Sequence, residues 1–152
     1  MMPETTPALL PIRLFVGWVF LRASLTKLST GWLEEPRLAA VLEGWLKEGR
    51  TYAAYRPFLE AVVLPHAKLF SWLVCGGELC VGAALLAGLI TRGAALGGVV
   101  LTASFMLARG DGADANQTAP FVAMTLALLL GHSGRTLGLD AALAHKLPRW
   151  LT

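Results

Sequence analysis

Charged residues are scarce in this 152-residue sequence, at 15% of the chain against about 25% in soluble domains. Hydrophobic residues make up 55%. The net charge of +3 is spread along the chain, and no run of basic residues indicates nucleic-acid binding. This composition is not that of a soluble core. It predicts one domain, residues 1–152, embedded in a membrane.

The sequence also lacks the motifs of common cofactor sites. It contains no Gly-rich phosphate loop, no Cys-x-x-Cys pair and no Cys-x-x-Cys-His haem motif. Its two cysteines, Cys75 and Cys80, lie on one expected helix, where their side chains point about 140° apart and cannot form a disulfide. We therefore predict no metal and no haem, and the cysteines do not indicate a redox compartment.

Long apolar stretches are present instead. Four of them, at about 8–28, 67–90, 93–109 and 116–134, are candidate membrane spans. The turn at Thr91–Arg92 is short enough only for a tight antiparallel hairpin, and small residues at four-residue spacing favour close packing of its two helices. We therefore expect an all-α fold, an integral membrane four-helix bundle.

The connector at 29–65, between the first two spans, is too polar to cross a membrane. Leu38, Leu42 and Trp45 follow helical spacing, which predicts an amphipathic helix. A second helix is expected between Pro57 and Pro65. We expect this connector to lie on the membrane surface and to cap one end of the bundle.

The C-terminal tail, 135–152, is predicted to contain a short amphipathic helix. Asp140 is its expected N-cap, with Leu143, Leu147 and Trp150 on its apolar side. Four spans place both termini on one side of the membrane. The distribution of lysine and arginine does not decide which side is cytoplasmic.

Glu78 is the one charged residue between Leu69 and Ile90, and it lies near the midplane of the second span. A carboxyl group in hydrocarbon costs from about 2.5 kcal/mol upward, so it needs a partner, a proton or a water pocket. When the spans are aligned by depth, most polar side chains share the connector half. They are Arg22, Ser24, Thr26, Lys27, Cys75, Glu78, Ser104, Arg109, Asn116 and Gln117. This asymmetry predicts a polar pocket beneath the connector.

In the functional interpretation, this pocket binds a small anion, a quinone head group, or both. Arg22, Lys27 and Arg109 would supply positive charge to the anion. Asn116 would supply hydrogen bonds. Glu78 would be the counter-charge or a proton acceptor, because carboxyl groups in such surroundings take part in proton transfer.

Cys75 is a further catalytic candidate as a thiolate nucleophile, although buried cysteines usually act as small hydrophobic residues. A structural interpretation stays open beside the functional one. In it, a buried Arg22–Glu78 pair fixes the register of two helices, and the other cations reach toward the membrane surface.

Short motifs occur in a fixed order along nearly the whole chain. They are Arg13-x3-Gly17-x2-Phe20-Leu21 with Lys27, Gly77-Glu78-Leu79-x2-Gly82, Gly88-Leu89-x-Thr91-Arg92, Asn116, and Gly134-Arg135-x2-Gly138-Leu139-Asp140. In order and spacing they resemble the DoxX/DoxD family of four-helix membrane proteins. The long connector resembles the DoxD type in particular, the small subunit of thiosulfate:quinone oxidoreductase.

The resemblance implies oxidation of thiosulfate, or a similar small sulfur anion, to tetrathionate. The electrons would pass to a membrane quinone, which is a substrate rather than a bound cofactor. It also implies a second subunit of the DoxA type and a cytoplasmic (inner) membrane location. The connector would then lie outside and both termini in the cytoplasm.

The alternative is a non-catalytic subunit that anchors or matures a redox complex. Further copies of this chain stay open as partners. A small-solute carrier is disfavoured, because the sequence has no inverted repeat and no pair of broken helices.

Overall fold

The computed structural model describes residues 7–34, 37–110, 115–131 and 133–143, and all regular structure in these ranges is helical. Side chains are described for the same ranges except at positions 115, 116 and 135. The elements are η1 (Pro7–Leu9), α1 (Leu10–Ser29), α2 (Arg37–Lys47), α3 (Arg56–Phe58), η2 (Leu59–Val63), α4 (Ala67–Ala87), α5 (Thr91–Arg109), α6 (Ala115–Leu130), η3 (Ser133–Arg135) and α7 (Leu139–Leu143).

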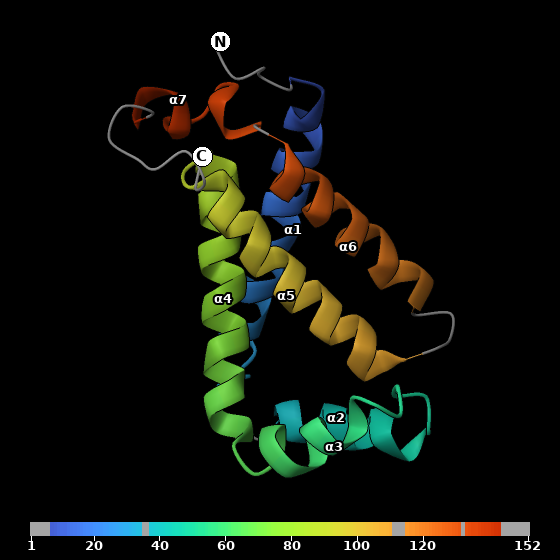
Figure 1. Ribbon diagram of the computed structural model, residues 1–152. Helices are drawn as coiled ribbons and strands as arrows, with labels where there is room; N and C mark the ends of the chain where they lie inside the picture. The colour runs from blue at the N-terminus through green and yellow to red at the C-terminus, as the bar shows by residue number, and fades with distance from the viewer. Residues whose placement is uncertain (1–6, 35–36, 111–114, 132, 144–152) are drawn as a thin grey trace.

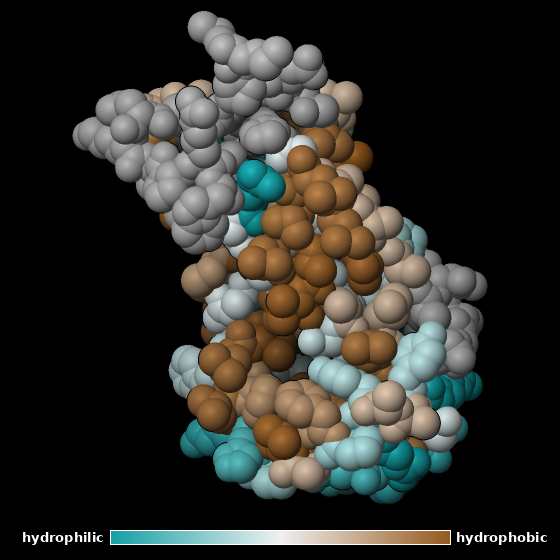
Figure 2. Space-filling view, in the orientation of Figure 1, coloured by the Kyte–Doolittle hydropathy of each residue, from teal (hydrophilic) through white to brown (hydrophobic). Residues whose placement is uncertain are grey.

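Three helical stretches are long and apolar enough to cross a membrane. They are Pro7–Ser29, Ala67–Ala87 and Thr91–Arg109, and the apolar helix at Gln117–Leu130 is shorter. Large apolar side chains are exposed along these helices, among them Phe15, Trp18, Leu69, Trp72, Leu96 and Val100. Figure 2 shows apolar residues covering the middle of one face and hydrophilic residues gathered at the connector end. The chain is therefore an all-helical membrane protein whose apolar belt faces lipid.

The long helices form two pairs that meet at one end of the molecule and diverge toward the other (Figure 1). In one pair α1 packs along α4, and in the other α5 packs along α6. The connector elements α2 and α3 lie across the end where the pairs diverge. The connector is thus the element that covers the diverging ends of both pairs.

Glycines let α1 and α4 pack closely. A Cβ atom added to Gly82 would lie 2.5 Å from the backbone nitrogen of Leu21 and 3.0 Å from the carbonyl oxygen of Gly17. The sequence predicted this type of packing for the α4–α5 hairpin, where Gly97 of α5 lies against Val81 of α4. The next residue, Gly98, lies against Thr125 of α6. Small residues therefore bring helices together within both pairs.

The connector is anchored to the end of α5. Thr51 Oγ1 donates a hydrogen bond to the carbonyl of Ala108 over 2.8 Å, and the Tyr52 amide donates to Leu107. Gly110 has a φ of +66° and packs so closely on the backbone of Arg50 that no Cβ atom could fit there. These contacts hold the connector over the open end of the helix pairs.

The connector also packs on the end of α5 through a second hydrophobic cluster, which includes Leu38, Leu42, Leu46, Leu59 and Val63 of the connector and Ala108 of α5. The segment expected to form one helix between Pro57 and Pro65 is a single α-helical turn, α3, followed by the π-helical turn η2. In η2 the amide of Leu64 donates to the carbonyl of Leu59, five residues back. The wider turn places Leu59 and Val63 in this cluster.

Asp140 has a different role from the one predicted. α7 begins at Leu139, so Asp140 lies inside its first turn, and its carboxylate accepts hydrogen bonds from the amides of Ile90 and Thr91 at 2.6 and 2.9 Å. Asp140 thus caps the start of α5, where a carboxylate is favoured by the helix dipole. The prediction that it caps the tail helix was wrong. Residues 144–152, with the predicted apolar positions Leu147 and Trp150, lie outside the described residues.

Arg13 holds the same segment against α1. Its side chain is buried, and its guanidinium donates hydrogen bonds to the carbonyls of Ser133, Thr136 and Leu137. The two anchors, Arg13 and Asp140, close the end of the molecule where the helix pairs meet.

Candidate functional site

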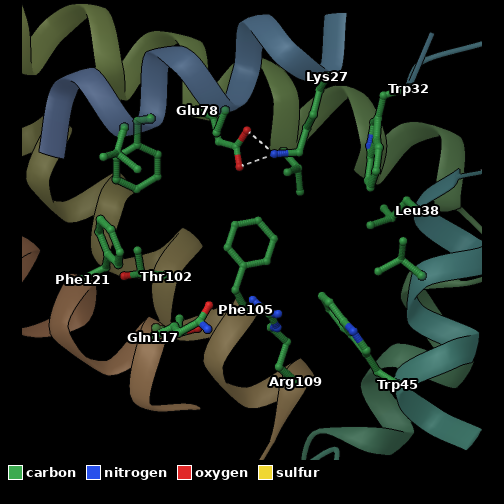
Figure 3. Close-up of a pocket in the computed structure, with 16 residues that line it drawn as sticks. Lys27, Trp32, Leu38, Trp45, Glu78, Thr102, Phe105, Arg109, Gln117 and Phe121 are labelled. Carbon is green, nitrogen blue, oxygen red and sulfur yellow. Dashed lines mark hydrogen bonds and ion pairs between the residues drawn. The ribbon is translucent and has the colours of Figure 1, made fainter. Parts of the chain in front are cut away.

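A central cavity of about 350 Å³ lies between the diverging helix pairs and beneath the connector. Helices α1, α4, α5, α6 and the connector all contribute to its wall. Its lining includes Lys27, Trp32, Leu38, Trp45, Glu78, Thr102, Phe105, Arg109, Gln117 and Phe121 (Figure 3). Of the polar residues grouped by depth in the sequence, Lys27, Glu78, Arg109 and Gln117 line this cavity.

Glu78 of α4 pairs with Lys27 of α1 across one side of this cavity. The Lys27 Nζ atom lies 2.7 and 2.6 Å from the two carboxylate oxygens, so both oxygens accept a hydrogen bond. The Glu78 side chain is 3% exposed and that of Lys27 is 19% exposed. The structural interpretation expected a pair with Arg22. The partner is Lys27, and Arg22 is exposed on α1.

Further polar donors line the cavity at other points. The guanidinium of Arg109 lies 5.5 Å from the ring centroid of Trp45, and Gln117 is nearby on α6. The indole nitrogen of Trp32 is buried, and no hydrogen-bond partner for it occurs among the described residues. Figure 3 shows the Phe105 ring pointing into the cavity between the Lys27–Glu78 pair and the side of Arg109 and Gln117. Hydrogen-bond donors therefore lie on two sides of the cavity, with aromatic rings between them.

Arg22 lies in an outer hollow on α1, together with Phe15, Trp18 and Thr26. This hollow adjoins the central cavity, because Val19, Ala23 and Lys27 line both. Lys27 and Arg109 line the central cavity itself, whereas Arg22 lines only the adjoining outer hollow.

The remaining predicted site residues are placed differently. Cys75 is 2% exposed and packs on Ser24, whose hydroxyl donates to the Cys75 carbonyl at 2.9 Å. Cys75 does not belong to the lining of the central cavity. The side chain of Asn116 lies outside the part of the chain whose side chains are described. Its neighbour Gln117 lines the cavity.

The aromatic lining was not predicted from the sequence. Tryptophans in a connector on the membrane surface are typical of a membrane–water interface, but Trp32 and Trp45 both line the cavity. Helical spacing offered a signal for the others, since Phe105 precedes Arg109 by one turn and Phe121 follows Gln117 by one turn. Once Arg109 and the start of α6 had been placed at the pocket, these two rings could have been placed there too.

Comparison with known proteins gives one match. No curated protein and no solved structure matches the chain. The DoxX family model matches residues 8–109, which run from the start of α1 to the end of α5 and include Lys27, Glu78 and Arg109. This match covers well over half of the 152 residues. The chain therefore belongs to the DoxX family, which is linked to redox-related membrane proteins.

Proposed function

We propose that this protein is the membrane subunit of an oxidoreductase that binds a quinone in the central cavity. The electrons would come from thiosulfate or a similar small sulfur anion, as the DoxD-type resemblance implies. One observation carries the proposal: hydrogen-bond donors lie on opposite sides of a cavity whose remaining wall is mostly aromatic and apolar, with Glu78 and two threonines as its other polar side chains.

A quinone head group matches this lining. It is a flat ring with an acceptor oxygen at each of two opposite edges. Lys27 and Trp32 can donate to one oxygen, and Arg109 and Gln117 can donate to the other. Phe105 offers a ring face for stacking between them. The cavity volume of about 350 Å³ is within the range of small-molecule sites.

Reduction of a quinone takes up two electrons and two protons. Glu78 is a carboxyl group on the cavity wall, and its contact with Lys27 gives it a route for exchanging a proton with a group beside the bound ring. In this proposal Glu78 supplies or relays a proton, and Lys27 positions the carboxylate.

The sulfur anion supplies the electrons. Oxidation of two thiosulfate ions to one tetrathionate releases two electrons, which are the two that one quinone takes up. It releases no protons, so the two protons of the quinol come from water, through Glu78 in this proposal. Arg22, Lys27 and Arg109 remain the proposed anion-binding cations, with Arg22 in the adjoining outer hollow. Asn116 remains a proposed hydrogen-bond donor. Cys75 has only a packing role here, because its side chain contacts Ser24 away from the cavity.

We further propose that α6 completes a four-span bundle in the cytoplasmic membrane, with both termini in the cytoplasm. A second subunit of the DoxA type is the proposed partner in catalysis. The shared walls of α1, α4, α5 and α6 around the central cavity support the four-helix arrangement.

A second function is favoured by the position of Cys75. Because this thiol packs on Ser24 and does not line the cavity, the second proposal is a quinone-binding subunit whose electrons come from a partner protein. The isolated chain would then bind quinone but would not oxidise thiosulfate, in keeping with an anchoring or maturation role.

The test is quinone reduction by the purified chain in lipid with thiosulfate as the donor, run on wild type and Glu78→Gln. We expect turnover to fall by about a hundredfold in the variant, near the lower range for removal of a general acid or base. Glu60→Gln is the matched control, because Glu60 is exposed on the connector and pairs with Arg56. Its turnover should equal that of wild type.

Direct quinone binding separates the two functions. Binding without turnover by folded wild type would favour the subunit that depends on a partner. Equal turnover of Glu78→Gln and wild type would remove Glu78 from the mechanism. Absence of any quinone binding would overturn both functions.

A further inference from the structure

A second cavity, here the lateral cavity, lies beside the central one between α4, α5 and the connector. Its volume is about 300 Å³. Among the described residues that line it, only Tyr55 and Ser104 carry a hydroxyl group, and the other side chains are aliphatic or aromatic. Such a space stabilises a hydrocarbon chain and offers little to a charged or strongly hydrated ligand.

The two cavities share part of their walls. Leu38, Trp45, Val74 and Phe105 line both of them. In Figure 3 the Phe105 ring projects into the central cavity, so this side chain lies at the border between the polar and the apolar space. A ligand with a polar ring and an apolar extension could therefore occupy both at once.

The lateral cavity also reaches the lipid-facing surface. Leu73 of α4 and Val100 of α5 line it, and they are 56% and 59% exposed. Both lie within helices that are apolar enough to cross the membrane. Leu73 and Val100 therefore mark a mouth that borders the hydrocarbon layer. At the connector end the cavity is lined by Phe58, which is 40% exposed.

We propose that the lateral cavity holds the hydrocarbon tail of the quinone whose head group occupies the central cavity. The tail leaves the protein between Leu73 and Val100 and continues into the bilayer, and Phe105 separates head from tail. This inference rests on the proposed function. The wall that the two cavities share and the lipid-facing mouth favour a tail over a separate ligand.

The test uses a matched pair of substitutions on α4. Leu73→Trp places a large ring at the mouth, whereas Leu69→Trp makes the same change one turn earlier, at a residue 57% exposed that lines neither cavity. Dissociation constants are measured by calorimetry in nanodiscs of one lipid composition. The probes are a benzoquinone with a decyl tail and the same benzoquinone with a methyl group.

In wild type and Leu69→Trp, we expect the decyl quinone to bind about tenfold more tightly than the methyl quinone, because buried methylene groups strengthen binding. In Leu73→Trp the ratio of decyl-quinone to methyl-quinone affinity should fall to about one third or less of its wild-type value. The affinity for the methyl quinone should stay unchanged. Partition of the decyl tail into lipid contributes equally to all three proteins. It therefore cancels when their ratios are compared.

If the ratio of decyl-quinone to methyl-quinone affinity is the same in all three proteins and methyl quinone still binds, the proposed tail site is overturned. The proposed binding of the quinone head group would then still stand. A phospholipid acyl chain in the lateral cavity would give that result. Failure of all three proteins to bind either quinone would instead overturn the proposed function. If Leu73→Trp loses methyl quinone as well, Val100→Trp replaces it, with Leu96→Trp as its exposed control.

Discussion

Lys27 and Glu78 form the ion pair on which both the structure and the proposed chemistry depend. The carboxylate is nearly buried, and Lys27 is the cation that contacts it among the described residues. A buried charge without its partner costs far more than a surface charge, because neither lipid nor the apolar wall replaces water. The pair therefore couples α1 to α4 at the depth of the central cavity.

Substitution Lys27→Met should lower the free energy of unfolding by about 3 kcal/mol, because it leaves a buried carboxylate unpaired. The measurement is reversible unfolding in a detergent titration. Lys47→Met, at an exposed site on α2, is the matched control and should stay within about 0.5 kcal/mol of wild type. The double variant Lys27→Met/Glu78→Leu should recover much of the loss, since no charge remains buried. A single variant as stable as wild type would contradict a structural role for the pair.

The choice of Lys27 over Arg22 follows from the face of α1 that packs against the other helices. The buried residues of α1 are Arg13, Val16, Gly17, Phe20 and Ser24. Their spacing of three and four residues forms one stripe, and Lys27 continues it. Arg22 lies off this stripe. The depth of Arg22 and Lys27 in the membrane made both of them candidate partners of Glu78. The periodicity of the small and apolar residues shows which side of α1 faces the other helices, and only Lys27 lies on that side.

At the scale of the elements, the positions of the long helices follow from the apolar runs. The period of Leu38, Leu42 and Leu46 likewise places α2 on the connector. The lining of the central cavity could not be predicted in this way. It depends on the divergence of two helix pairs, which is set by contacts between residues far apart in sequence. The cap formed by Asp140 on Ile90 and Thr91 is another such long-range contact.

The close packing of α1 on α4 depends on Gly82, which leads to a test of the helix pair. Gly82→Ala places a Cβ atom 2.5 Å from the backbone of Leu21, so the two helices must move apart. We expect a loss of about 1–3 kcal/mol in the free energy of unfolding. The same detergent titration should show no loss for Gly76→Ala, because a Cβ atom there has no neighbour within 4 Å.

Quinone affinity should fall with Gly82→Ala as well, since Lys27 and Glu78 lie on the two helices that move apart. Gly76→Ala should keep the wild-type affinity. If Gly82→Ala leaves both stability and affinity unchanged, close contact of α1 with α4 is not what positions the ion pair.

The two ends of the protein are packed differently. One end is closed by Arg13 and Asp140, which hold the segment after α6 against α1 and α5. At the other end the helix pairs diverge and the connector lies across them (Figure 1). In the proposed function, a ligand would reach the central cavity at the connector half, where the walls are separate elements rather than one packed core.

Whether the chain crosses the membrane three or four times depends on α6. Its 16 residues extend about 24 Å, less than the roughly 30 Å of a bilayer core. It nevertheless packs along α5 and lines the central cavity together with three longer helices. A short span of this kind is accommodated by local thinning of the bilayer. If α6 crosses, three spans separate the connector from the segment that contains α7, so the two must lie on opposite sides.

Single cysteines at Lys47 on α2 and at Leu137, which is 85% exposed before α7, test this arrangement. With a membrane-impermeant maleimide, we expect labelling of Lys47→Cys in intact cells and of Leu137→Cys only after permeabilisation. The unmodified chain is the control, because Cys75 is buried and Cys80 lies within a span. If Lys47→Cys and Leu137→Cys are both labelled in intact cells, or both only after permeabilisation, α6 does not cross the membrane. The reverse pattern would keep four crossings and place the connector in the cytoplasm, so that the anion would enter from the cytoplasmic side.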